Sequence, residues 1–343
     1  MLFFLCLKFI YILLGLLWQG NNDWLSVFHR NDSSWYALIA ENGYPTVPPQ
    51  PGTESEFAFF PLYPALVSIF MPLLGTFHQA AFAFSLLTGL LLITLCFRLL
   101  RQLEWSDREI FRFLALYQLL PFHHFHHVFY SEQLFLLILA GIMLSLEQRS
   151  TALLFALSAL LALTRPTGLI YAATLPLLYL PNFNVPAFID WVRRCWPLMG
   201  APFGIFLWTG YLKLHCGDAL AFSHAQSGWN RKYCWPWESL FNDGNTAIIL
   251  ISIYAVLILI TALTMFRRSG FGVILFHGIN LLFPLSTGQV ISYPRYTSAN
   301  LPLFLRLRSF LEAPYFPWIL ALAATLHLFI YYAWVMNLPI WSY

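Results

Sequence analysis

Long apolar segments with almost no charge constrain this chain more than any other feature of its sequence. A helix needs ~20 mostly apolar residues to cross a bilayer, and roughly ten segments have that character. Only 10% of the 343 residues are charged, 59% are hydrophobic, and the mean hydropathy is +0.67. We therefore predict a polytopic integral membrane protein. Its predicted membrane segments are residues 2–18, 79–100, 110–128, 133–146, 152–163, 169–180, 197–214, 247–266, 271–284, 299–307 and 314–334.

The expected architecture is all-α, a bundle of about 9–11 transmembrane helices with short helices in the outer loops. No fixed-period repeat, Gly/Ser linker or low-complexity tract divides the chain, so residues 1–343 are predicted to form a single membrane domain. Segment 2–18 is followed by no small-residue cleavage site, so we expect a retained span and not a signal peptide. The net charge of +3 is dispersed without a basic run, which excludes nucleic acid as a partner.

The distribution of basic residues predicts an orientation. If segment 2–18 runs from inside to outside, eleven of the 18 Lys and Arg residues fall on the cytoplasmic side and five on the outer side. Residues 57–75, with three prolines, must then be interfacial or re-entrant on the outer side, because a span there would invert everything after it. The predicted location is the bacterial plasma membrane or the endoplasmic reticulum membrane, with the functional face periplasmic or luminal.

Each of the five outer cations lies in a segment that also holds acids, His, Trp or Tyr. A charge at the bilayer centre costs about 2.5 to 3.5 kcal/mol on insertion scales, so these groups are expected to reach the interface or line a protected cavity. The polar chemistry is therefore predicted to converge on one face. The segments concerned are residues 20–56, 121–132, 164–168, 215–238 and 286–296.

Six sequence blocks carry a resemblance to a known family. In order they are R-x-D with "IAENGY", "FAFFPLYP", "YSEQLF", "TRPTG", "GDALAFSHAQSGWNR" and "YPRY", covering residues 30 to about 304. Together they resemble the GPI mannosyltransferase II (PIG-V-type) family and its bacterial relatives in the GT-C superfamily. Family members usually carry a Trp just before the first acid, where this chain has Asn31.

The resemblance implies a GT-C-type bundle and an inverting glycosyltransferase. Such an enzyme takes a sugar, usually mannose, from a polyprenyl- or dolichyl-phosphate carrier. It transfers that sugar to a hydroxyl of a glycan or glycolipid acceptor on the outer or luminal side of the bilayer. Some family members work with a small membrane partner, so a partner subunit is a further expectation.

Asp32 is the predicted catalytic base. Glycosyl transfer from a lipid phosphate needs a carboxylate that takes the acceptor proton, and Asp32 lies just past a membrane segment, where partial burial and Arg30 can tune it. The alternative is that Asp32 caps the helix that begins at "SSWYALIAENG", although Ser33 or Ser34 can serve as cap. Arg30 is a predicted substrate contact, or simply a local partner of Asp32. Trp35 is expected to anchor the loop at the interface, the alternative being that it stacks on a sugar.

Four cations are candidates for binding the phosphate that leaves with the lipid: Arg165, Arg231, Lys232 and Arg295. The guanidinium of an arginine binds phosphate with two parallel hydrogen bonds. Arg165 lies where two short apolar halves meet, as in broken helices around membrane-embedded sites, or it snorkels to the headgroups. Arg231 ends the block that contains Gln226 and Trp229, which suit a sugar or phosphate surface or an ordinary interfacial segment. Arg295 stands between two tyrosines, consistent with phosphate contact or an aromatic belt.

Two further acids are predicted to contact substrate. Glu132 begins a membrane segment on the outer face, where it either orients acceptor or donor hydroxyls or simply interacts with the helix dipole. Asp218 either binds substrate or accepts backbone hydrogen bonds in a turn.

Histidines and cysteines leave two alternatives open. The run "HHFHH" at 123–127 would place His123 and His127 on one helical face, a spacing suited to Zn or Ni, but no acidic partner is evident. We therefore expect no metal and no cofactor, the lipid-phosphate sugar being a substrate. Cys216 and Cys234 share an outer loop, where they form a disulfide or remain free thiols.

Two other classes of function compete with an enzyme. A transporter or flippase of lipid-linked sugars also needs a broken-helix cavity with buried charge, but its polar residues should be distributed for alternating access and not gathered on one face. A non-catalytic membrane subunit that stabilises a partner enzyme is the third class.

Overall fold

The computed structural model describes residues 1–20, 23–181, 184–241, 246–266 and 269–338. In these ranges the chain folds into helices without a β-strand, which confirms the predicted all-α class. The α-helices are α1 Leu2–Gln19, α2 Asp32–Asn42, α3 Leu62–Leu74, α4 Phe77–Gln102, α5 Asp107–Leu119, α6 Glu132–Gln148, α7 Thr151–Thr164, α8 Pro166–Thr174, α9 Val185–Cys195, α10 Gly200–Cys216, α11 Ala221–His224, α12 Pro236–Phe241, α13 Thr246–Phe266, α14 Phe271–Leu282, α15 Tyr293–Ser298, α16 Leu301–Phe304, α17 Arg308–Leu311 and α18 Phe316–Val335.

Apolar helices form the body of the molecule. Within the described ranges, α1, α4 and α18 are long and apolar enough to cross a membrane, and α3, α7, α13 and α14 contribute shorter apolar stretches. Large apolar side chains lie exposed on the long helices, among them Leu13, Leu91 and Phe329. Such exposure suits contact with lipid, since the hydrocarbon core replaces water around these residues.

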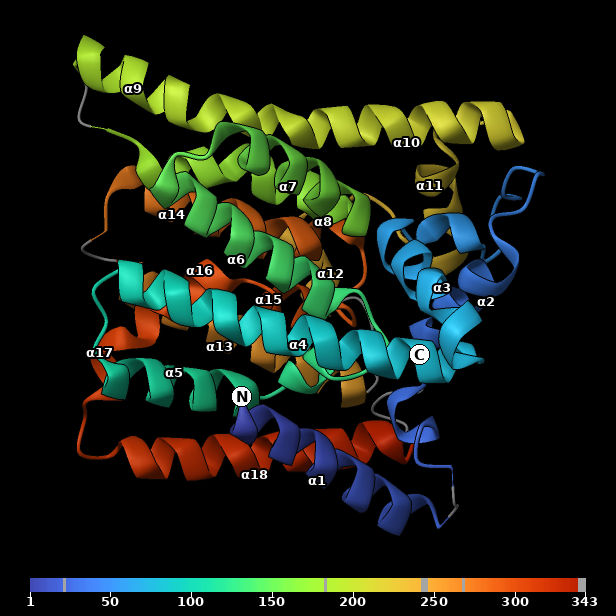
Figure 1. The fold of residues 1–343 in the computed structure, drawn as a ribbon, viewed down its shortest axis with the longest axis horizontal. Coiled ribbons are helices and arrows are strands. Elements are labelled where there is room, and N and C mark those ends of the chain that lie inside the picture. Colours follow the sequence, from blue (N-terminus) through green and yellow to red (C-terminus); the bar gives the residue numbers. More distant parts are fainter. Residues whose placement is uncertain (21–22, 182–183, 242–245, 267–268, 339–343) are drawn as a thin grey trace.

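The helices run roughly along one direction, and the polar loops collect at one end. The short helices α2, α3 and α11 lie at one end of the bundle, whereas α9 and α17 lie at the other (Figure 1). Three of the eleven basic residues that the charge distribution assigns to the cytoplasmic side, Arg193, Arg194 and Arg308, belong to α9 and α17. These three charges therefore lie at the end of the bundle opposite to α2, α3 and α11.

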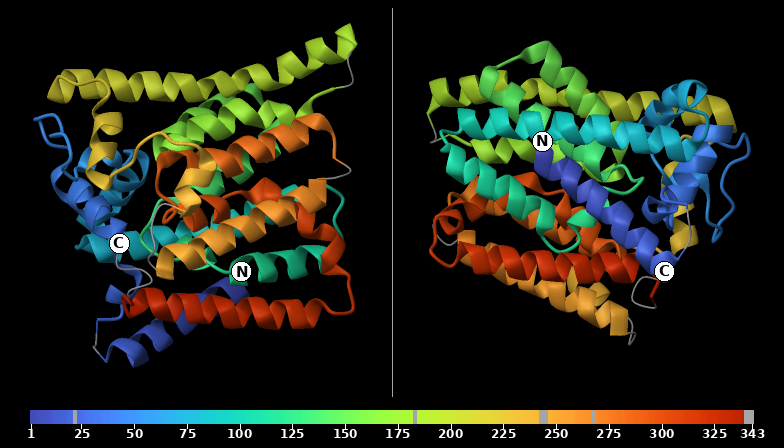
Figure 2. Two further views of the ribbon diagram at one scale, coloured as in Figure 1. Left: turned by 180° about the vertical axis from the view of Figure 1, so that it is seen from behind. Right: turned by 60° about the horizontal axis from the view of Figure 1, so that its bottom comes forward.

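Helices from the two ends of the sequence pack together. α1 and α18 lie side by side (Figure 1, Figure 2). The Tyr11 hydroxyl forms a hydrogen bond with His327, and the Tyr331 hydroxyl donates to the Tyr11 carbonyl at 3.3 Å. Glycines permit a second close contact, because a Cβ added to Gly200 of α10 would lie 2.0 Å from the Phe155 carbonyl oxygen of α7. Small residues allow such close approach of two membrane helices.

Two predicted membrane segments have different structures. Segment 110–128 is not one helix: α5 ends at Leu119, Leu120 is extended with ψ 149°, and a short 3-10 helix follows at His123–His126. The reason is Pro121, which disfavours the helical conformation in the residue before it. Segment 299–307 consists of the four-residue α16 and a 3-10 turn, too short to cross a bilayer.

Two other features of the topology agree with expectation. The break predicted between residues 163 and 169 occurs at Arg165, whose backbone is extended (φ −161°, ψ 153°) between α7 and α8. In segment 57–75, α3 has 13 residues, about 20 Å at 1.5 Å per residue, shorter than the hydrocarbon core.

Candidate functional site

Asp32 is the first residue of α2, and its carboxylate forms an ion pair with Arg295. The N-cap position is occupied by Asn31, whose φ is 45° and whose side chain makes no capping hydrogen bond. The alternative prediction that Asp32 caps the helix is therefore wrong. The carboxylate side chain of Asp32 is 25% exposed and is directed away from the helix backbone toward a residue 263 positions later.

Arg30 does not pair with Asp32. Its guanidinium donates hydrogen bonds to backbone carbonyls, at 3.0 Å to His29 and 3.1 Å to Val335 at the end of α18. Its own carbonyl accepts a hydrogen bond from the Tyr130 hydroxyl at 3.1 Å. The predicted substrate role of Arg30 is thus corrected: because these carbonyls hold its side chain, Arg30 fastens the first outer loop to α18.

Glu132 links two arginines in the protein interior. Its side chain is completely buried at the first residue of α6, and Oε1 lies 2.6 Å from Arg295 Nε and 3.0 Å from Arg165 Nη1. With the pair between Arg295 and Asp32, this gives a continuous row of alternating charges, Arg165, Glu132, Arg295 and Asp32. We call these four residues the charge row. Glu132 occupies the helix N-terminus and binds side chains at the same time.

The neighbouring carboxylates keep Arg295 ionised. Burial alone would lower the pKa of Arg295, but the Asp32 and Glu132 carboxylates hold it well above its usual value. The guanidinium of Arg295 also lies over the ring of Tyr130, 4.4 Å from its centroid. Arg295 therefore remains a cation with a fixed orientation.

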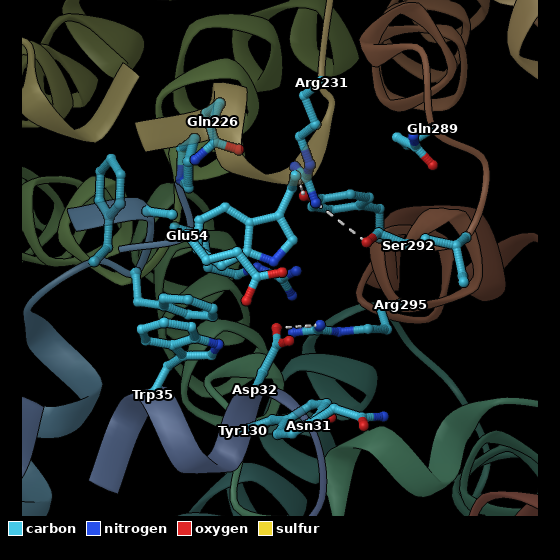
Figure 3. A pocket seen from close by; sticks show the side chains of 18 of the residues that line it. Asn31, Asp32, Trp35, Glu54, Tyr130, Gln226, Arg231, Gln289, Ser292 and Arg295 are labelled. Atoms are coloured by element: carbon cyan, nitrogen blue, oxygen red, sulfur yellow. Dashed lines mark hydrogen bonds and ion pairs between the residues drawn. The ribbon is translucent and has the colours of Figure 1, made fainter. Parts of the chain in front are cut away.

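A pocket of about 460 Å³ opens beside the charge row. Asp32, Arg231 and Arg295 face the same space (Figure 3), and Arg165 lines it as well. The Arg231 guanidinium donates to the Tyr296 hydroxyl at 3.0 Å and to Ser292 Oγ at 3.2 Å. Three guanidinium groups and the carboxylate of Asp32, from four distant parts of the sequence, thus converge on one cavity.

An aromatic surface forms another part of the same pocket. Trp35, Phe59 and Trp229 line it and contact one another, with ring centroids between 5.6 and 5.8 Å apart. Trp229 was predicted here, together with Gln226, which also lines the pocket. Trp35 was interpreted as an interfacial anchor, and its place in the pocket wall corrects that interpretation, because Phe59 and Trp229 hold its ring inward.

Asp218 lies outside the pocket. Its carboxylate accepts a hydrogen bond from the Leu220 backbone at 2.9 Å and pairs with His224 Nδ1 at 2.7 Å. The turn interpretation is therefore the one that the structure supports, and the predicted substrate contact is corrected because both carboxylate oxygens have local partners.

The histidine run and the cysteines contribute to the interior. His123, His124, His126 and His127 are buried, and His126 Nε2 lies 3.2 Å from Ser298 Oγ. Among the described residues, no group of three or more His, Cys, Asp or Glu is positioned to hold a metal ion. Cys216 and Cys234 are both free thiols, which decides between the two alternatives for this pair.

The pocket contains residues that the sequence analysis did not single out, although they lie in the polar segments 20–56 and 286–296. Among them are Glu54 on the loop after α2, Gln289, Ser292 and Tyr296. Ser292 and Tyr296 flank Arg295 in the block "SYPRY", so the position of that block was the one available signal. Glu54 has no sequence signal of this kind, since it lies in an irregular loop between proline-rich residues and η2, Glu56–Ala58.

No protein-family model matches the chain, and no curated protein matches it in sequence. Among solved structures the chain is similar to ArnT from Cupriavidus metallidurans, crystallised with undecaprenyl phosphate, with a TM-score of 0.60 and 14% identity. The similarity covers 93% of this chain and 61% of the ArnT chain, so this chain spans less than two thirds of the length of ArnT. At this identity the likeness concerns the fold alone. It confirms the fold expected from the sequence: this chain is a polytopic, all-α integral membrane protein with the fold of ArnT.

Proposed function

We propose that this protein is an inverting glycosyltransferase that moves a hexose, mannose in the first instance, from a polyprenyl-phosphate carrier to an acceptor hydroxyl. The observation that carries the proposal is the pocket that Asp32 shares with Arg165, Arg231 and Arg295. A carboxylate and several cations around one cavity suit a reaction in which a hydroxyl loses a proton and a phosphate leaves. The undecaprenyl phosphate held by ArnT, a protein of the same fold, supports a lipid phosphate as ligand.

The proposed reaction forms one bond and breaks one bond at the anomeric carbon, and it transfers one proton to Asp32. The acceptor oxygen attacks the anomeric carbon from the face opposite the phosphate, which inverts that centre. The bond between the anomeric carbon and the phosphate oxygen breaks, and the lipid phosphate leaves with the electron pair. Asp32 takes the proton of the acceptor hydroxyl, and the guanidinium groups stabilise the phosphate dianion.

The different surroundings of the arginines support different tasks for them in the proposed reaction. Arg295 touches Asp32 and lines the pocket, so it can hold the base in place and also contact the phosphate. Arg231 comes from the opposite wall and is held by Ser292 and Tyr296. Glu132 is a positioning residue: it is buried behind the pocket and fixes Arg165 and Arg295.

The compartment, the acceptor and the family within the superfamily belong to the same proposal. The pocket residues of α2 lie toward the end of the bundle that the distribution of Lys and Arg assigns to the periplasm or the lumen. The six sequence blocks favour a GPI mannosyltransferase II-like enzyme, with a glycan or glycolipid acceptor in a bacterial plasma membrane or the endoplasmic reticulum. A small membrane partner and independence from a metal are further parts of the hypothesis.

The test is transfer of radiolabelled mannose from a short polyprenyl-phosphate mannose to a membrane lipid extract by the purified protein in detergent. Wild type should form a labelled product, and Asp32→Asn should lose at least ~100-fold in rate while it still binds the donor. Glu41→Gln is the matched control, because Glu41 is an exposed carboxylate of the same helix that does not line the pocket. Equal rates in wild type and Asp32→Asn would remove Asp32 from the mechanism.

Absence of product from both proteins despite donor binding would count against transfer from this donor. Glucose and other hexoses on the same carrier then distinguish a wrong sugar from a wrong function. Movement of the donor lipid across the membrane of a sealed vesicle that contains the protein, without a covalent product, would favour a transporter.

A further inference from the structure

Glu54 is a second carboxylate of the pocket, and the charge row does not use it. We infer that Glu54 binds hydroxyl groups of the donor sugar and so separates a sugar subsite from the phosphate subsite. The inference rests on the proposed function and adds a specificity-determining residue to it. The observations that carry it are the direction of the side chain, the support of its loop and the surfaces around it.

The carboxylate of Glu54 points into the pocket on the same side as Asp32 (Figure 3). Unlike Asp32, it makes no hydrogen bond and no ion pair with the described residues, and it is solvent-exposed. An ionised carboxylate has two oxygens that only accept hydrogen bonds. The acceptor capacity of Glu54 is therefore available to a ligand, whereas that of Asp32 is partly taken up by Arg295.

The loop that carries Glu54 is held against the far wall of the pocket. The Gly52 amide donates a hydrogen bond to Ser227 Oγ at 3.1 Å. A Cβ added to Gly228 would lie 2.3 Å from the Thr53 carbonyl oxygen and 2.6 Å from the Glu54 amide nitrogen. Only a residue without a side chain permits this approach, so Gly228 sets the position of Glu54 over the cavity.

The chemistry around Glu54 differs from that around the arginines. Trp35, Phe59 and Trp229 present aromatic surfaces, and Gln226 adds an amide group to the same part of the wall. A hexose ring has an apolar face of C–H bonds and a rim of hydroxyls. Aromatic rings fit the first, and carboxylate and amide groups fit the second.

The distribution of charge assigns the two ends of a sugar phosphate. Arg231 is held by Ser292 and Tyr296, and Arg165 and Arg295 by Glu132, which together give a cationic region suited to phosphate. A phosphate next to Glu54 would be repelled by a second anion. The phosphate therefore belongs with the arginines, and the neutral hydroxyls belong with Glu54.

The test compares two lipids that differ only in the sugar. Affinities of the full-length protein in detergent are measured for a short polyprenyl phosphate and for the corresponding polyprenyl-phosphate mannose, with wild type, Glu54→Ala and Glu54→Gln. Glu54→Ala should lower the affinity for polyprenyl-phosphate mannose by about tenfold and change the affinity for polyprenyl phosphate by less than about twofold. The reason is that hydrogen bonds to a charged group are lost on the sugar side alone. Glu54→Gln keeps one acceptor oxygen and should fall between wild type and Glu54→Ala.

Two further variants test the position of the Glu54 loop and serve as a control for the loss of a carboxylate outside the pocket. Gly228→Ala keeps Glu54 but displaces its loop, so it should reproduce the selective loss for the mannose lipid. Glu41→Gln, which removes an exposed carboxylate outside the pocket, should change neither affinity.

The results distinguish the inference from the proposed function. If Glu54→Ala lowers the affinities for both lipids equally, or lowers neither, the sugar subsite is refuted while the enzyme proposal stands. If Glu54→Ala changes only the KM for the acceptor, Glu54 contacts the acceptor and not the donor sugar, which also refutes the inference. If wild type binds neither lipid, the proposed function fails, and the inference fails with it.

Discussion

Replacing Glu132 by Gln should destabilise the protein strongly, although it changes a single atom. The Glu132 side chain is 0% exposed, and its partners Arg165 and Arg295 are 7% and 13% exposed. After the substitution two buried guanidinium groups retain one carboxylate, that of Asp32, which contacts Arg295 alone. Leaving one buried charge without its partner costs about 3 to 5 kcal/mol, so a loss of this size is expected in the free energy of unfolding.

Unfolding in mixed detergent and SDS, followed by tryptophan fluorescence, measures this loss. The control is Asp190→Asn, which breaks the exposed ion pair with Arg149 at 2.7 Å and should change little. Arg165→Gln completes a double-mutant cycle, because removal of both charges restores the balance of the charge row. The double variant should be more stable than the sum of the single losses predicts, with a coupling of about 1 to 3 kcal/mol.

Strict additivity of the two substitutions would refute the reasoning, because it would mean that Glu132 and Arg165 do not stabilise each other. A loss under about 1 kcal/mol for Glu132→Gln would refute it too, since that is the range of exposed pairs. Binding of a short polyprenyl phosphate gives an independent reading. It should weaken in Glu132→Gln even under conditions where the variant stays folded, because Arg165 and Arg295 lose their common anchor.

Three further outcomes are expected. Arg231→Gln should weaken polyprenyl-phosphate binding by about 10- to 100-fold, the range of charge-assisted hydrogen bonds, with Arg231→Lys intermediate in a titration of the same lipid. Gly200→Ala should destabilise by about 1 to 3 kcal/mol in the SDS assay, since its Cβ would overlap the Phe155 carbonyl of α7, and an unchanged midpoint would contradict the close packing. Burial and the neighbouring His78 lower the pKa of His29, in the loop before α2, from 6.5 to about 4. The unfolded chain therefore binds a proton first, and stability should fall as the pH drops from 6.5 towards 4; His29→Gln should flatten this dependence, and parallel curves for both proteins would refute it.

The fold was largely predictable because its main signals are local. Apolar length identified α1, α4 and α18, and the dipeptide Arg165–Pro166 marked the break between α7 and α8. Where prediction went wrong, a local rule had been underweighted: Pro121 ends α5 and converts the predicted helical histidine run into a buried 3-10 turn.

The site was predictable in part. Asp32, Arg165, Arg231 and Arg295 were singled out and do meet in one pocket. Arg30 was misassigned because its neighbour in sequence suggested a pair, whereas the three-dimensional structure offers it backbone carbonyls at the end of α18. Asp218 was misassigned for the opposite reason, since each of its carboxylate oxygens has a partner nearby in the sequence, the Leu220 amide or His224. Glu54 was missed, because a lone acid in an irregular loop carries no pattern.

The sequence by itself determined that the chain is a helical membrane protein and that its polar residues gather in a few loops, because hydropathy and helix length act over stretches of about 20 residues. Only the tertiary structure decided which charges are partners. Arg295 and Asp32 are separated by 263 positions, and Arg295 and Glu132 by 163. Such pairs depend on how α2, α6 and α15 pack against one another, and no local pattern specifies that packing. The division between an arginine-lined subsite and an aromatic subsite with Glu54 arises at the same level, from loops that meet only when the helices have assembled.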